Sequence, residues 1–239
     1  MRDARTRLIV RELPRAGETV SLPAAEAAHA RARRLAAGDS VLLIDGSGRS
    51  AAADVLRATR AATVVRVSAI LDPPAASPAT SLYVAGLRAE RLAWVVEKAT
   101  ELGAARVVLI ESARTQSFRA AATLLPRLER VARAAAKQSG RADWPAVGGP
   151  TALERVLADE TSPTRLFLDF DGEPFPGHTP ALASALAVGP EGGWTDAERA
   201  GAAARGWTPV TLPVGTLRAE TAAIAGLVLL RAAMDRKTG

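Results

Sequence analysis

The fold is decided by two stretches near the C-terminus, Val188-Gly189-Pro190-Glu191-Gly192-Gly193-Trp194-Thr195 and Leu212-Pro213-Val214-Gly215-Thr216-Leu217-Arg218-Ala219-Glu220-Thr221-Ala222. Each stretch follows a short apolar run that indicates a buried strand, and each leads into a segment with helical periodicity. Two glycine-bearing strand-to-helix turns on one sheet let backbone atoms wrap a small ligand. The pair therefore predicts a small-ligand site.

The composition excludes several kinds of site. The 239 residues contain no cysteine, which removes disulfides, thiolate metal ligands and a cysteine nucleophile, and favours a reducing, cytoplasmic setting. His29 and His178 have no metal-ligand spacing, so no metal site is predicted. No run reaches the roughly 18 apolar residues that span a bilayer, and no signal peptide or membrane partner is expected. The formal net charge of +6 permits a polyanionic partner without requiring one.

Residues 7–70 are predicted to be rich in β-strands. Apolar or alternating runs indicate the strands, turn signals such as Asp45-Gly46-Ser47-Gly48 separate them, and one helix is expected at 23–36. Three prolines between positions 72 and 78 then favour an extended connector. The chain is therefore predicted to form domains at 1–71 and 80–239, joined by a proline-rich linker at 72–79. The strands expected in the first domain are 7–13, 19–22, 40–45, 50–56 and 63–70.

After the linker, strands alternate with helices. This alternation predicts an α/β domain with a mostly parallel sheet that is covered on both faces. Thr195 with Glu198 three residues later forms a capping-box pattern at the start of one helix. The expected strands are 81–87, 106–110, 166–170, 183–188 and 209–212, and the expected helices are 90–102, 123–139, 195–205 and 219–234.

The last helix contains an unbroken apolar stretch. Every position from Ala222 to Leu230 is apolar, glycine included. A helix on the surface of a monomer shows a polar face, so this one is expected to be buried on nearly all sides, inside the fold or against a second subunit. The sequence therefore predicts a homodimer.

The charged residues of the two loops permit different interpretations. Taken alone, the first loop is also explained as a tight strand-to-helix connection with a solvated Glu191. In the second loop, Glu220 suits the positive end of a helix, whereas Arg218 does not. We therefore expect Arg218 to have an anionic partner, either a carboxylate of this protein or a phosphate.

A third region is basic, with eight Lys and Arg residues against two acidic residues between Arg106 and Arg141. Part of the excess follows one face of the helix expected at 123–139, and the rest lies in the flanking loops. Exposure to solvent explains the basic residues of the helix taken alone. Together with those of the flanking loops, they indicate a surface that follows the phosphates of a nucleic acid. With two residues of the N-terminal helix added, the candidate RNA-binding residues are His29, Arg33, Arg114, Arg119, Arg130, Arg133, Lys137 and Arg141.

Three segments together resemble a known family. Glu97-Lys98-Ala99-Thr100-Glu101-Leu102-Gly103, Val188–Thr195 followed by Glu198, and Leu217–Ala222 occur in the order and spacing typical of the ribosomal RNA small subunit methyltransferase E family. That family belongs to the trefoil-knot (SPOUT) methyltransferases. The resemblance covers nearly the whole chain.

The resemblance implies a fold, a reaction and partners. The fold is an α/β SPOUT domain whose parallel sheet carries a deep trefoil knot, preceded by a small PUA-like β-barrel that binds RNA. The reaction is methylation of uridine N3 in 16S ribosomal RNA of the 30S subunit, with S-adenosyl-L-methionine as the cofactor. The enzyme is expected to be a cytoplasmic homodimer.

Site residues are carried over from the matching motifs. Arg218, Glu220 and Thr221 are expected near the transferred methyl group, and the catalytic candidates are Arg218, Glu220 and Glu191. The cofactor-binding candidates, which act largely through backbone groups, are Leu168, Gly189, Pro190, Glu191, Gly192, Leu212, Val214, Gly215, Leu217, Thr221 and Ala222.

The chain departs from the family pattern in two places. Pro213 and Gly215 stand where the family usually has a glycine and an arginine, and Lys137 replaces a usual acidic residue. Two alternative functions remain open: a non-catalytic RNA-binding protein, and a knotted methyltransferase that acts on another RNA. The sequence does not decide whether Glu191 or Glu220 accepts the proton of the base.

Overall fold

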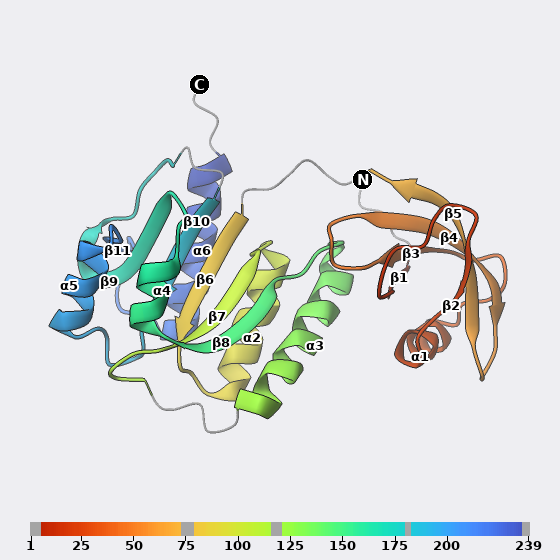
Figure 1. Cartoon of the computed structure of the whole chain (residues 1–239), viewed down its shortest axis with the longest axis horizontal. Helices are drawn as coiled ribbons and strands as arrows, with labels where there is room; N and C mark the ends of the chain where they lie inside the picture. Colours follow the sequence, from red (N-terminus) through yellow and green to blue (C-terminus); the bar gives the residue numbers. More distant parts are fainter. Residues whose placement is uncertain (1–5, 73–78, 116–120, 180–182, 236–239) are drawn as a thin grey trace. The chain divides into compact units, whose positions relative to one another are not determined.

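The computed structural model in Figure 1 describes residues 6–72, 79–115, 121–179 and 183–235. The chain divides into two compact units, one made of 1–76 with 136–144 and the other of 77–135 with 145–239. Most of the linker predicted at 72–79 lies outside the described residues. No helix in the described ranges is long and apolar enough to cross a membrane.

The first unit is built on a five-stranded sheet with the order β1-β3-β4-β5-β2. β1 pairs with β3 in parallel, and the other pairings are antiparallel. Alternate residues such as Leu43, Ala53 and Val65 are fully buried and form its core. The elements are β1 (Thr6–Ile9), β2 (Thr19–Ser21), α1 (Ala24–Ala32), β3 (Ser40–Ile44), β4 (Ser50–Ala58) and β5 (Thr63–Leu71).

Helix α1 is shorter than the predicted 23–36. It ends at Ala32 because Arg34 adopts a left-handed conformation, with a φ of 57°. The backbone N–H of Leu35 then bonds to the carbonyl of Ala30, which is a common way to close the last turn of a helix.

A segment far along the chain completes the first unit. Lys137 pairs with Glu26 of α1, with Nζ at 3.0 and 3.2 Å from the two carboxylate oxygens. Farther on, Asp143 forms β-bridges with Gly46 and Ser47. The sequence did not predict that 136–144 would pack with the N-terminal residues.

The second unit contains six strands in the order β11-β9-β10-β6-β7-β8, all parallel. The prediction of an α/β unit with a parallel sheet is confirmed. β8 and α4 were not predicted. The elements are β6 (Ala79–Ala85), α2 (Ala89–Glu101), β7 (Arg106–Glu111), α3 (Ala121–Ser139), β8 (Ala146–Ala152), α4 (Leu153–Asp159), β9 (Thr164–Pro174), β10 (Ala183–Val188), α5 (Asp196–Ala204), β11 (Thr208–Thr211) and α6 (Ala219–Asp235).

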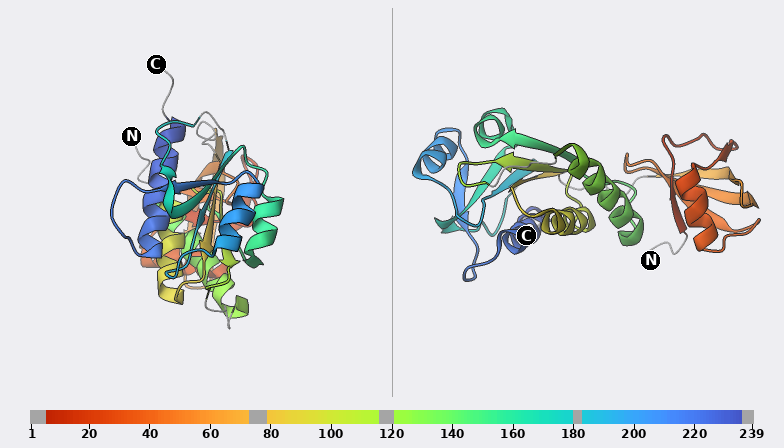
Figure 2. Two further views of the ribbon diagram at one scale, coloured as in Figure 1. Left: turned by 90° about the vertical axis from the view of Figure 1, so that its left-hand side faces the viewer. Right: turned by 90° about the horizontal axis from the view of Figure 1, so that it is seen from below.

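Helices cover both faces of this sheet, as the right-hand view of Figure 2 shows, with α4 and α5 on one face and α2 and α6 on the other. Tyr83, Val108 and Phe167 belong to the core beneath α4 and α5. On the opposite face, α6 lies so close that a side chain at Gly226 would meet Leu186. Burial on both faces explains why these strands are continuous apolar runs in the sequence.

Helix α6 is buried on one side only within a single chain. Ala223, Leu227 and Leu230 have almost no exposed surface, but Val228 is 44% exposed. On the neighbouring helix α2, Trp94 is 40% exposed. Of the two kinds of cover predicted for α6, burial inside the fold is therefore not found, because α6 forms the outer layer over the sheet, and cover by a second subunit stays a prediction.

One polar pair lies within the core under α4. The hydroxyl of Tyr83 donates to the carboxylate of Glu160, which also accepts from the backbone N–H of Ser162. Burial and the hydrogen bond to Glu160 raise the pKa of Tyr83. Burial alone would raise the pKa of Glu160, but the hydrogen bonds from Tyr83 and Ser162 outweigh it and lower that pKa. The carboxylate form is thus favoured in the folded state.

Tyr83→Phe is expected to lower the free energy of unfolding by about 1–3 kcal/mol at neutral pH, because a buried carboxylate loses a donor. A glutamate whose pKa is lowered by folding stabilises the folded state above its unfolded pKa of about 4.3. This stabilisation is lost as the pH falls through the folded pKa. The difference between wild type and variant should therefore shrink at acid pH, as measured by urea unfolding between about pH 3.5 and 7. Glu160→Gln, which cannot ionise, is the matched control. If Tyr83→Phe lowered the free energy of unfolding equally at both ends of the pH range, Glu160 would not be the carboxylate that Tyr83 stabilises.

Candidate functional site

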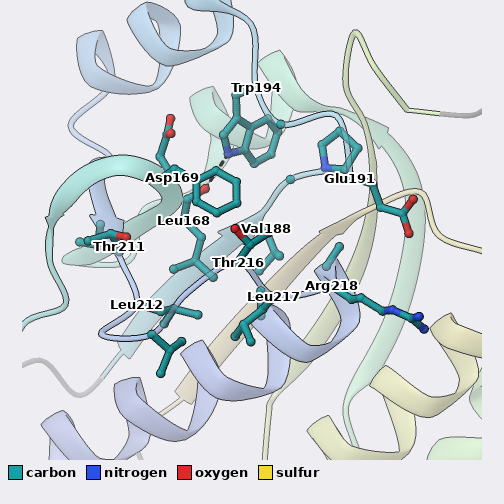
Figure 3. A pocket seen from close by; sticks show the side chains of 18 of the residues that line it. Leu168, Asp169, Val188, Glu191, Trp194, Thr211, Leu212, Thr216, Leu217 and Arg218 are labelled. Carbon is teal, nitrogen blue, oxygen red and sulfur yellow. Dashed lines mark hydrogen bonds between the residues drawn. The ribbon is translucent and has the colours of Figure 1, made fainter.

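A cavity of about 410 Å³ lies at the carboxyl ends of β10 and β11, beside the middle of β9 (Figure 3). Its size is within the usual range for small-molecule sites, and this end of a parallel sheet is where ligands bind in α/β proteins. The loop after β10 and the loop after β11 both line it, as the sequence predicted. The predicted residues that line the cavity are Leu168, Gly189, Pro190, Glu191, Leu212, Val214, Gly215, Leu217, Arg218 and Ala222.

Two of the predicted cofactor residues are not among those that line the cavity. Gly192 lies against Arg114, whose Nη1 donates to the Gly192 carbonyl at 2.6 Å. Thr221 is exposed in the first turn of α6. Residues that the sequence did not indicate line it instead, and these include Asp169, Phe170, Trp194 and Arg199.

Trp194 holds the first loop against the sheet. Its indole is buried, stacks on Phe167 with ring centroids 4.2 Å apart, and donates from Nε1 to the carbonyl of Leu168 at 2.7 Å. Glycine is required at 189 because a Cβ there would lie 2.8 Å from the indole ring. Trp194 therefore fixes the distance between the loop and β9.

Helix α5 starts directly after this loop, with the predicted capping box. The Thr195 side chain accepts from the backbone N–H of Glu198, and the Glu198 side chain accepts from the backbone N–H of Thr195. The same carboxylate accepts from the backbone N–H of Ala113 at 2.8 Å. The capping box is confirmed, and it also ties the start of α5 to the segment after β7.

A bulge in β9 forms one wall of the cavity. Pro209 and Val210 are consecutive in β11, yet their partners in β9 are Phe167 and Glu173. The intervening residues bulge outward, and Gly172 allows β11 to approach the end of the bulge closely. This irregular segment cannot be read from the apolar pattern, which predicts only a strand at 166–170.

The bulge is anchored by an ion pair. The side chain of Asp169 is almost completely buried and accepts from Nε of Arg199 at 2.6 Å and from Nη2 at 3.3 Å. Next to it, Phe170 is 67% exposed although it lines the cavity. The anchored bulge thus presents an aromatic ring at the cavity wall.

Charged residues meet at one margin of the cavity, where Figure 3 shows Glu191 and Arg218 opposite Thr211. Arg91 of α2 donates from Nη1 to Glu191 at 2.5 Å and places Nε 3.4 Å from a carboxylate oxygen of Glu220. The structure therefore joins both predicted catalytic carboxylates through a residue that the sequence did not indicate.

Arg218 is exposed at this margin. Among the residues that the structure describes, no carboxylate pairs with it. Of the two partners expected for Arg218, a carboxylate of the protein is therefore not found there. Nor do the described residues contain a group of three or more His, Asp or Glu side chains that could hold a metal ion.

The candidate RNA-binding residues have varied surroundings. Arg130 and Arg133 are exposed on α3, and Arg133 pairs with Glu129 at 3.4 Å. In the first unit, Lys137 is engaged by Glu26, and Arg141 pairs with Asp143 at 2.9 Å.

Arg114 donates to the Gly192 carbonyl, and three more candidates complete this set. His29 and Arg33 lie at the end of α1, and burial, together with the charge of Lys137, lowers the pKa of His29. Arg119 lies outside the described residues.

Comparison with known proteins identifies the family. Residues 75–231 match the family model described as an RNA methyltransferase domain. The chain is 32% identical over 216 residues to ribosomal RNA small subunit methyltransferase E of Synechocystis sp., covering 86% of this chain and 70% of the relative. It is 31% identical over 227 residues to the protein of that name from Mycobacterium bovis, covering 90% and 87%. The chain belongs to the ribosomal RNA small subunit methyltransferase E family.

A solved structure of the same family has the same fold. It is ribosomal RNA small subunit methyltransferase E of Neisseria gonorrhoeae, crystallised with S-adenosyl methionine. The TM-score is 0.88 at 26% identity, with 95% of this chain and 97% of that chain covered. The resemblance seen in the sequence motifs is confirmed.

Gly189→Ala is expected to destabilise the protein by about 1–3 kcal/mol, because the added methyl group would collide with the buried indole of Trp194. Gly215→Ala is the matched control. A Cβ at 215 meets no atom within 4 Å, so its effect on stability should stay within about 1 kcal/mol. Chemical unfolding followed by tryptophan fluorescence measures both. Equal stability of the two variants would show that Trp194 does not require glycine at 189.

Proposed function

We propose that this protein is an S-adenosylmethionine-dependent methyltransferase that modifies N3 of a uridine in 16S ribosomal RNA of the small subunit. The observation that carries the proposal is the cavity at the ends of β10 and β11 and beside β9, which both motif loops line. Membership in the ribosomal RNA small subunit methyltransferase E family supports the reaction class. The substrate places the reaction in the cytoplasm.

The cavity fits the cofactor in size and chemistry. Leu168, Val188, Leu212 and Leu217 give it apolar walls that suit a purine and a methylene chain. Glycines 189, 193 and 215 bring the backbone to the surface of the cavity, where its polar groups are accessible to a ligand. A charged margin at Glu191 and Arg218 suits the polar end of the molecule and the approach of RNA.

The chemistry requires help from the protein. N3 of uridine carries a proton at neutral pH, so this proton must be removed before the nitrogen is a good nucleophile. Bound S-adenosylmethionine supplies an electrophilic methyl carbon on a positively charged sulfur. Arg218, which has no carboxylate partner in the described ranges, stabilises the negative charge of the base or of a flanking phosphate. Glu191 and Glu220 are the available proton acceptors, and the loops hold the reactants in line.

The proposal includes a homodimer that forms through helix α6. The uncovered side of α6 at Val228 and the exposed Trp94 on the neighbouring helix α2 support this assembly, since tryptophan is enriched in interface cores. It also includes the trefoil knot implied by the family resemblance, and the lining of one cavity by segments after both β10 and β11 is compatible with it.

The five-stranded first unit is proposed to be the PUA-like RNA-binding domain, with His29 and Arg33 among its RNA contacts.

The direct test is methyl transfer from labelled S-adenosylmethionine to 30S subunits and to naked 16S RNA, followed by identification of the modified nucleoside. We expect 3-methyluridine. Calorimetry with the cofactor is the companion measurement, and no binding at high micromolar concentration would favour a non-catalytic RNA-binding protein. Methylation of transfer RNA or of a ribose hydroxyl would show that the protein acts on another substrate.

Arg218→Ala is expected to lower the rate of methyl transfer by about 100-fold or more, because the developing negative charge loses its cation. The dissociation constant for S-adenosylmethionine should change far less. Arg155→Ala, which removes an exposed arginine of α4, is the control and should leave both values unchanged. Equal losses of rate and of cofactor affinity in Arg218→Ala would assign Arg218 to cofactor binding instead.

A further inference from the structure

Arg91 lies between the two carboxylates that the motifs place at the active site. Its Nη1 donates to Oε1 of Glu191 at 2.5 Å, and its Nε lies 3.4 Å from Oε1 of Glu220. The three residues come from α2, from the loop after β10 and from α6. A single guanidinium therefore links three elements beside the cavity.

The two carboxylates have different surroundings. The side chain of Glu191 is 65% exposed, whereas that of Glu220 is 12% exposed. The second oxygen of Glu220, Oε2, is buried and has no hydrogen-bond partner among the described residues. A buried carboxylate oxygen without a donor has lost its water without compensation, so it requires an explanation.

Glu220 lies next to residues that line the cavity, although it is not itself among them. It follows Ala219 in the first turn of α6, and both Ala219 and Arg218 line the cavity. One oxygen of Glu220 is thus engaged by Arg91, and the other is buried and has no donor among the described residues.

We propose that Arg91 is a positioning residue that holds Glu220 so that its free oxygen accepts the proton of the target base. This inference rests on the proposed function and assigns the base among the two candidates. As the N–H bond breaks, the proton passes to Oε2 of Glu220, and the electron pair on nitrogen forms the new bond to the methyl carbon. The carbon–sulfur bond breaks toward sulfur, and Glu220 later releases its proton to solvent. Glu191, the more exposed of the two carboxylates, accepts from Nη1 of Arg91 and so fixes the guanidinium.

The geometry requires arginine rather than lysine. Arg91 uses two different nitrogens, Nη1 for Glu191 and Nε for Glu220. Lysine has the same charge, but its single nitrogen cannot occupy both of the positions that Nη1 and Nε occupy here. Arg91→Lys is therefore a conservative variant that separates charge from position.

The experiment compares Arg91→Met, Arg91→Lys, Glu220→Gln, Glu191→Gln and the double variant Arg91→Met with Glu220→Gln. Arg155→Met, on the far helix α4, is the matched arginine control. For each protein we would measure the single-turnover rate and KM of methyl transfer to 30S subunits, the dissociation constant of S-adenosylmethionine by calorimetry, and the thermal unfolding temperature.

Glu220→Gln and Arg91→Met are each expected to lower the single-turnover rate by about 100-fold, the usual range for loss of a general base. Arg91→Lys should lose about 10-fold, and Glu191→Gln less than Glu220→Gln. Cofactor affinity should remain within about threefold of wild type, as it should for Arg155→Met. The double variant should be no slower than Glu220→Gln alone, because Arg91 acts through Glu220.

Other outcomes would overturn the inference. Losses that multiply in the double variant would show that Arg91 acts independently of Glu220. A lower unfolding temperature in Arg91→Met with a normal rate would make the network a link between helices only. If Arg91→Met does not fold, full activity of Glu220→Gln still sinks the inference. Wild-type protein that binds no cofactor would instead overturn the proposed function, and this inference with it.

Discussion

The indole of Trp194 is the contact on which the cavity depends. It stacks on Phe167, donates to the carbonyl of Leu168 and excludes any side chain at position 189. These three constraints fix the loop after β10 against β9, directly before the bulge of that strand. Because helix α5 starts directly after Trp194, the same contact sets where Arg199 can reach Asp169. Sheet, loop and helix are thus placed by one aromatic ring in the core.

Most elements of the fold could be predicted, since strands buried on both faces are continuous apolar runs and the helices show apolar stripes. β8 and α4 were missed for a physical reason. The segment 146–152 contains two glycines and a proline, a composition typical of loops, and it is a strand only because β7 offers it an edge to pair with. The tie between Lys137 and Glu26 was also missed, because nothing local in the sequence relates two residues 111 positions apart.

The candidate site could likewise be predicted only in part. Its two loops could be predicted because each carries its glycines and charges within one short stretch. The residues that organise those loops could not, because their partners are distant in sequence: Arg91 is 100 residues from Glu191, and Asp169 is 30 residues from Arg199. Arg91 belongs to the polar side of an ordinary amphipathic helix, where a solvated arginine is the simplest expectation. Only the packing of α2 beside α6 and beside the loop after β10 gives it two carboxylate partners.

A strand usually pairs with its neighbours and lines a site with the same residues, whereas in β9 the bulge lines the cavity and the residues beside it make the pairing. Residues before and after it pair with β11, and β10 pairs with β9 only as far as Leu168. The side chains of Phe170 and Asp171 can therefore be exchanged without a shift in the register of either neighbour, provided that Asp169 keeps its ion pair with Arg199 and position 172 stays glycine. This wall of the cavity is free to diverge between related proteins while the sheet stays constant. The exposed ring of Phe170 stands at the position where such divergence would change what the cavity accepts.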